Sequence, residues 1–112
     1  MNKFRGECEI VVDNKNVYLL FSLYTFMLFS EEMGVDLDEM NKALGKSRGM
    51  SVLVWCAMEA GFKERKEKNP YSVIDTADIL STLTAEDQIK IGKTIEAVLL
   101  SSDETDNNGK KK

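Results

Sequence analysis

The most apolar stretch of the chain, residues 17–34, predicts a strand that passes directly into a helix. Val17 to Phe21 is a compact run of β-branched, aromatic and aliphatic residues, which is typical of a short strand. Ser22 is a candidate N-cap for the helix, and Gly34 is placed to end it in left-handed geometry. One side of this helix is expected to carry Leu23, Phe26, Met27 and Ser30.

A second strand is predicted just before this stretch, over residues 7–12. Its residues alternate, with Cys8, Ile10 and Val12 on the apolar face. The polar segment 13–16 favours a tight turn, and Asn16 in left-handed geometry would give a hairpin with a bulge. Because a lone two-stranded hairpin is marginal in water, we expect its apolar face to rest on helices.

Four further helices are predicted downstream: Asp36–Gly45, Met50 to about Lys63, Ser72–Leu83, and a Thr84-capped helix that ends near Leu100. The helix from Met50 is apolar nearly all round, so it is either central in the fold or covered by a partner. Its stripe at helical spacing consists of Met50, Leu53, Val54, Ala57, Met58 and Gly61.

These elements predict an α+β, mainly α fold in which an N-terminal β-hairpin packs on four or five helices. The chain has 112 residues, which suits one domain. We place that globular domain over residues 1–100. Residues 101–112 lack apolar side chains and are predicted to form a disordered polar tail.

The composition narrows the classes of function. Histidine is absent, which excludes histidine-based triads and metal sites and lowers the prospect of any enzyme. A net charge of −4 argues against non-specific nucleic-acid binding, which depends on lysine and arginine. The apolar run 17–29 is too short to span a membrane. Cys8 and Cys56 are expected to be buried free thiols. We expect no enzyme activity, no cofactor, no nucleic-acid partner and no membrane partner.

Acidic pairs are the remaining candidates for chemistry or metal binding. Helix neighbours one or two residues apart do not face each other, so the pairs fit helix ends and caps better than a catalytic site. The run Asp36-Leu37-Asp38-Glu39 lacks the central glycine and terminal glutamate of a calcium loop. We therefore expect no metal site.

Methionines and aromatic residues concentrate in the predicted helices. They could simply fill the core, because methionine suits irregular gaps. They could also form an adaptable surface for a partner helix. The candidate partner-binding residues are Phe26, Met27, Phe29, Met33, Met50, Trp55, Met58 and Phe62.

The order of these features resembles the small tail assembly chaperones of long-tailed bacteriophages, including members related to gene transfer agents. The resemblance runs from Glu7 to Leu100 and rests on the segments VDNKNVYLLFSL, EEMGVDLDEM, MSVLVWCAMEAG and TAEDQIKIGKTIEAVL. It implies a non-enzymatic, mainly helical protein that self-associates. Such a protein binds the helical tape measure protein in the host cytoplasm, keeps it soluble and helps tail tube protein assemble around it. It is absent from the mature virion.

Other functions are also compatible with the sequence. A small phage-encoded regulator or inhibitor would bind a host protein through its acidic surface. An enzyme with carboxylate chemistry ranks much lower. A helix-turn-helix DNA binder would need a basic recognition helix, whereas the helices here are acidic or balanced.

Overall fold

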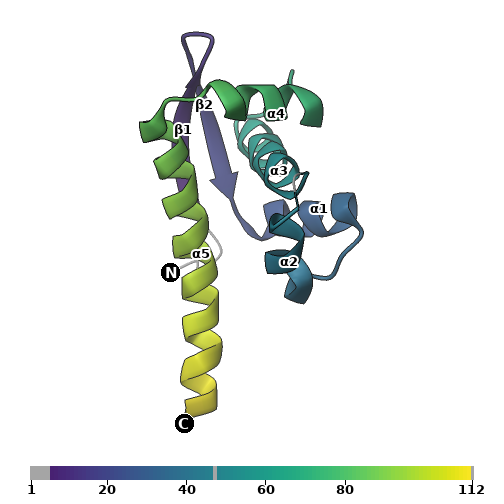
Figure 1. Ribbon diagram of the computed structural model, residues 1–112, viewed down its shortest axis with the longest axis vertical. Coiled ribbons are helices and arrows are strands. Elements are labelled where there is room, and N and C mark those ends of the chain that lie inside the picture. The colour runs from purple at the N-terminus through teal and green to yellow at the C-terminus, as the bar shows by residue number, and fades with distance from the viewer. Residues whose placement is uncertain (1–5, 47, 112) are drawn as a thin grey trace.

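The computed structural model describes residues 6–46 and 48–111, without the side chains of Leu37 and residues 100–111. A two-stranded hairpin is followed by helices, so the predicted α+β, mainly α fold is confirmed (Figure 1). In chain order the elements are β1 Gly6–Val12, β2 Lys15–Phe21, α1 Leu23–Met33, a 3₁₀ turn Leu37–Glu39, α2 Met40–Leu44, α3 Gly49–Glu64, α4 Val73–Thr82 and α5 Ala85–Lys111.

The hairpin turn is tighter than predicted. Asp13 and Asn14 both have positive φ, 52° and 64°, and Val12 pairs directly with Lys15. Two successive left-handed residues form the turn whose twist suits a two-residue hairpin, and Asp and Asn tolerate that geometry. The predicted bulge with Asn16 in left-handed geometry is therefore wrong, since Asn16 pairs in register with Val11.

The two strands bury one face of the hairpin. Cross-strand partners share a face, and the buried face carries Cys8, Ile10, Val12, Val17, Leu19 and Phe21. On the opposite face Glu7, Glu9 and Val11 are exposed, whereas Leu20, the partner of Glu7, is buried. The alternation predicted for residues 7–12 is thus confirmed, and the helices supply the packing that a lone hairpin lacks.

Helices lie along both strands of the hairpin (Figure 1). α3 approaches β2 so closely that a Cβ atom on Gly61 would lie 2.3 Å from the carbonyl oxygen of Tyr18. α5 runs beside β1, and its residues Ile91, Ile95 and Val98 are buried. Covering both strands in this way removes the open sheet edges that promote pairing between chains.

Polar contacts join α5 to the backbone of β1. Asp87 Oδ2 accepts a hydrogen bond from the Val11 amide at 3.1 Å, and Lys90 Nζ donates one to the Glu9 carbonyl at 3.2 Å. Asp87 is buried, and its carboxylate lies 3.5 Å from Lys90 Nζ. α5 therefore satisfies backbone groups that the second strand does not reach.

We expect Asp87→Ala to destabilise the fold by about 1–3 kcal/mol, because the Val11 amide would lose its charged acceptor in a partly buried setting. Glu86 is the matched control, since it is exposed in the same helical turn and its change to alanine should cost less than about 0.5 kcal/mol. Urea unfolding followed by circular dichroism measures both. Equal losses in the two variants would show that the Asp87 contact contributes nothing specific.

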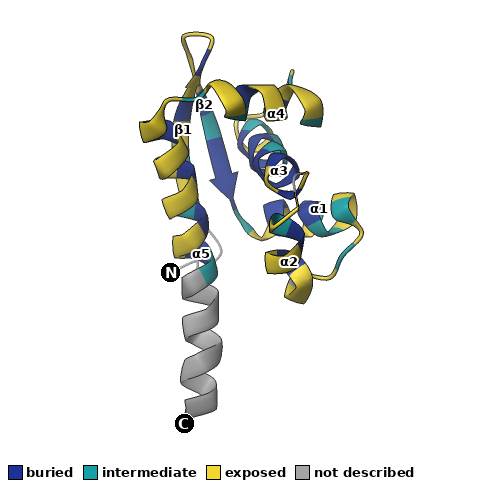
Figure 2. Ribbon diagram, viewed as in Figure 1, coloured by how far each residue is buried: buried dark blue, intermediate teal, exposed yellow. Residues whose placement is uncertain are grey.

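The helix from Met50 was expected to be either central in the fold or covered by a partner, and α3 occupies the central position (Figure 2). Most of its length is buried, including Val52, Leu53, Val54, Cys56, Ala57 and Met58. It packs against α1, β2 and α4. Its nearly all-round apolar character is thus explained by neighbours within the chain.

The buried face of α1 differs from the prediction by about one residue. Leu23 and Met27 are exposed, whereas Thr25, Phe26 and Phe29 are buried. Thr25 occupies a core position because its hydroxyl donates a hydrogen bond to the Leu20 carbonyl, which satisfies both groups. A pattern of apolar residues does not predict a polar residue in the core. The predicted face is therefore rotated about the helix axis relative to the observed one.

Two predicted helix boundaries also need correction. The predicted helix Asp36–Gly45 is a 3₁₀ turn, Leu37–Glu39, followed by the short α2. α5 continues to Lys111 instead of ending near Leu100, since neither glycine nor proline interrupts residues 101–108. The predicted disorder of residues 101–112 stays a prediction, since the structure describes their backbone only to Lys111 and none of their side chains. Among the described residues, no helix is both long and apolar enough to cross a membrane.

Candidate partner-binding surface

Three exposed apolar side chains lie together on the outer face of α1. Leu23 is 48% exposed, Tyr24 43% and Met27 58%. Leu23 and Met27 are one helical turn apart and Tyr24 lies beside them, so the three share one arc of the helix. We call these three residues the α1 patch. Neighbouring exposed apolar side chains are more informative than isolated ones, because such patches mark interaction surfaces.

The structure divides the predicted partner-binding residues into three groups. Met27 and Met50 are exposed, and Met33, Trp55 and Phe62 are half-buried. The buried residues are Phe26, Phe29 and Met58. These three fill the core and cannot contact a partner while the protein is folded, so their assignment to a binding surface is wrong. Leu23 and Tyr24 belong to the exposed surface instead, and their only signal in the sequence was their place in the first turn after Ser22.

The side of α3 that carries Trp55 and Glu59 is partly covered by the chain segment that leads to α4. Trp55 Nε1 donates a hydrogen bond to the Tyr71 carbonyl at 2.8 Å. Asn69 Nδ2 donates one to Glu59 Oε2 at 2.9 Å. This segment runs back along α3, and the indole is half-buried. Trp55 therefore contributes mainly to packing within the fold and offers little free surface to a partner.

A shallow depression opens between the N-terminal end of α1 and the C-terminal end of α3. Tyr24 and Phe62 line it, together with Glu59, Lys63, Lys66, Glu67, Lys68 and Asn69. Lys63 Nζ lies 5.6 Å from the centroid of the Tyr24 ring, a cation–π arrangement. At the other end of the helix pair, Arg48 Nη1 lies 3.9 Å from Met33 Sδ. The two helices are therefore antiparallel, and the α1 patch adjoins the depression at Tyr24.

The C-terminus of α3 holds a lysine in an unfavourable backbone geometry. Lys66 has φ of 59°. The Glu67 amide donates to the Phe62 carbonyl at 2.8 Å, and the Lys66 amide donates to the Lys63 carbonyl at 3.0 Å. These two bonds form a Schellman motif, in which the left-handed position is usually glycine. A lysine there carries a conformational cost that glycine would avoid.

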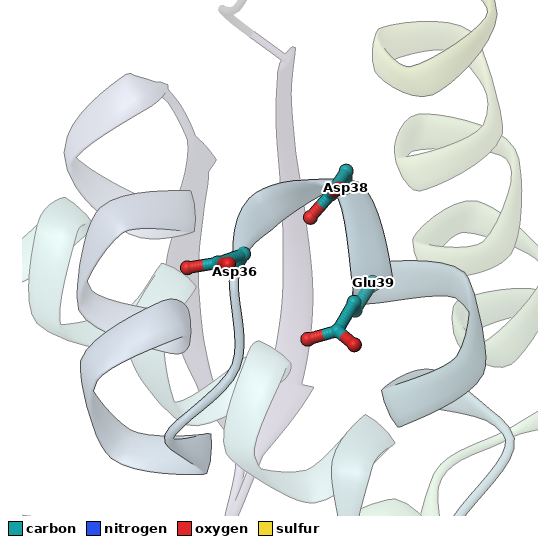
Figure 3. Close-up of side chains that lie close together, drawn as sticks. All are labelled: Asp36, Asp38 and Glu39. Atoms are coloured by element: carbon teal, nitrogen blue, oxygen red, sulfur yellow. The ribbon is translucent and has the colours of Figure 1, made fainter.

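Three carboxylates gather at the start of the 3₁₀ turn (Figure 3). One oxygen each from Asp36, Asp38 and Glu39 lies within 4.8 Å of the others, and all three residues are exposed. Such side chains suit the positive N-terminal end of a helical segment. Exposed acidic groups are common without a metal, so the cluster by itself does not identify a metal centre.

The two cysteines are free thiols in apolar surroundings. Cys56 is buried in α3, and burial raises its thiol pKa to about 12, with Glu32 and Glu59 adding to the shift. Cys8 is half-buried, and burial raises its thiol pKa as well. Because the thiolate is the nucleophile, neither cysteine has the environment of a reactive thiol. This agrees with their expected role as small apolar residues.

Comparison of the chain with models of protein families, with curated proteins and with solved structures finds no match.

Proposed function

We propose that this protein is a tail assembly chaperone of a long-tailed bacteriophage, which binds the helical tape measure protein and keeps it soluble during tail assembly. The proposal rests on the resemblance of residues 7–100 to that family. The observation that carries it is the α1 patch, because three adjacent apolar side chains remain exposed beside a well-packed core.

The patch suits a helical client. Leu23 and Met27 are spaced one turn apart on an antiparallel helix pair, and a third helix can lie along such a pair with its apolar face inward. Methionine adapts to differing client side chains, while Tyr24 supplies a rigid aromatic surface. Each contact of this size is weak by itself.

A long client offers many such contacts. Several chaperone molecules, or a self-associated assembly of them, would bind successive segments of one tape measure protein. Multivalent binding raises the overall affinity without any strong single contact, and it permits release as tail tube protein assembles. We place this activity in the host cytoplasm and exclude the protein from the mature virion.

Co-expression with the tape measure protein encoded in the same genome tests the proposal. We expect the chaperone to raise the fraction of client recovered in the soluble extract, and to elute with it in one complex during size-exclusion chromatography. A client that stays insoluble, with no complex formed, would refute the proposal. Recovery of a globular host protein in place of the client would favour the regulator or inhibitor.

A further inference from the structure

We propose that the client segments bound by this protein are amphipathic helices with acidic residues beside their apolar face, and that Lys63, Lys66 and Lys68 select them. This inference rests on the proposed chaperone function and specifies its substrate class. We call these three lysines the lysine rim. They line the depression that adjoins the α1 patch at Tyr24.

The charge of this surface is opposite to that of the whole chain. The protein carries a net charge of −4, yet the depression is lined by three lysines against two glutamates. Glu59 is half-buried, and its carboxylate accepts a hydrogen bond from Asn69. Lys66 and Lys68 are exposed, and neither forms an ion pair with another residue in the described ranges 6–46 and 48–111. An acidic client could therefore contact Lys66 and Lys68 without displacing an ion-pair partner in the described part of the chain.

The position of the rim fits a helix docked on the α1 patch. Phe62 and Tyr24 form the apolar part of the depression, and Lys63 Nζ lies 5.6 Å from the Tyr24 ring. A client helix that places apolar side chains on Leu23, Tyr24 and Met27 would bring its flanking carboxylates to the C-terminal end of α3. Charges at the rim of an apolar contact select partners and speed association more than they add affinity.

The backbone geometry of Lys66 supports a role in binding. Lysine occupies the left-handed position of the Schellman motif, where glycine would be more stable. Residues held in costly geometry concentrate at functional sites. The lysine side chain contributes a cation at the depression that glycine could not supply. Stability therefore favours glycine at position 66, whereas binding of an acidic client favours lysine.

Overlapping peptides that span the tape measure protein test the selection, with affinity measured by fluorescence anisotropy at low and high salt. We expect the tightest binding from acidic amphipathic segments and a marked loss of affinity at high salt. The variant Lys66→Glu/Lys68→Glu should bind these peptides about tenfold more weakly at low salt. The matched control is Lys42→Glu/Lys93→Glu, which makes the same change in net charge at exposed positions on α2 and α5 and should bind as the wild type does.

Lys66→Gly separates binding from structure. It should raise Tm by roughly 4 °C through relief of the left-handed lysine, while it weakens binding of acidic peptides. A variant that binds unchanged would show that the lysine serves no partner.

The outcomes distinguish this inference from the proposed function. If tape measure peptides bind but neither their acidity nor the lysine rim affects affinity, the selection by charge is wrong and the chaperone function stands. If no tape measure peptide binds, two model helical peptides test whether the surface selects by charge. Both have the same leucine face, which is flanked by glutamate in one peptide and by lysine in the other. If the wild type prefers the glutamate peptide and Lys66→Glu/Lys68→Glu abolishes this preference, selection by the lysine rim is supported. Equal binding of the two peptides would overturn it.

Discussion

Gly61→Ala is expected to destabilise the protein by about 3 kcal/mol, at the upper end of the usual cost of overpacking. The added Cβ atom would lie 2.3 Å from the Tyr18 carbonyl oxygen and 3.1 Å from a carbon of the Tyr18 ring. The obstacle at 2.3 Å is strand backbone, which cannot move aside as a flexible side chain would. α3 would have to shift away from β2, and the apolar contacts between them would weaken.

Gly92→Ala is the matched control for this variant. Gly92 lies within α5, and a Cβ atom there would meet nothing within 4 Å. Because alanine favours helix over glycine by about 1 kcal/mol, this variant should be more stable than the wild type. Urea unfolding followed by circular dichroism measures both changes. If Gly61→Ala is as stable as the wild type, α3 does not lie as close to β2 as the contact between Gly61 and the Tyr18 carbonyl oxygen requires.

Phe29→Ala is expected to destabilise the protein by about 3–5 kcal/mol, the typical cost of removing a buried aromatic side chain. Phe29 is 0% exposed and belongs to the core cluster. Met27, two residues earlier in the same helix, is 58% exposed, so Met27→Ala should change stability by less than about 0.5 kcal/mol.

The pair tests which side of α1 faces the core. Both substitutions replace a large apolar side chain in the same helix with alanine. The difference in helix propensity between the two changes is small compared with the expected difference in stability. Thermal and urea unfolding of the two variants, measured together, give the comparison. Comparable losses would mean that the α1 patch is packed within the protein and offers no free surface.

Local patterns explain why much of the fold could be predicted. The strand Val17–Phe21 and the helix from Met50 carry their signals in consecutive residues, and both are present as β2 and α3. The turn type was less predictable, because residues 13–16 contain an aspartate and two asparagines that all tolerate left-handed geometry. Only the register of the two strands selects Asp13 and Asn14.

The candidate surface was less predictable because its exposure depends on individual side-chain contacts. Thr25 enters the core through a hydrogen bond to Leu20, and this contact turns Met27 outward and Phe29 inward. Trp55 is covered by the segment that contains Tyr71, sixteen positions later in the chain. No periodicity in the sequence encodes either contact. Methionine and aromatic content therefore indicated that a surface could exist but not which residues form it.

The binding role of the α1 patch is tested most directly by the soluble yield of tape measure protein co-expressed with Leu23→Glu/Met27→Glu. Both side chains are exposed, so this variant should fold normally while placing charge in the α1 patch. We predict that the variant fails to solubilise the client. The control Ile74→Glu, which changes an 81% exposed residue on α4, should perform as the wild type does. Full soluble yield with the α1 patch variant would show that the client does not bind at the α1 patch.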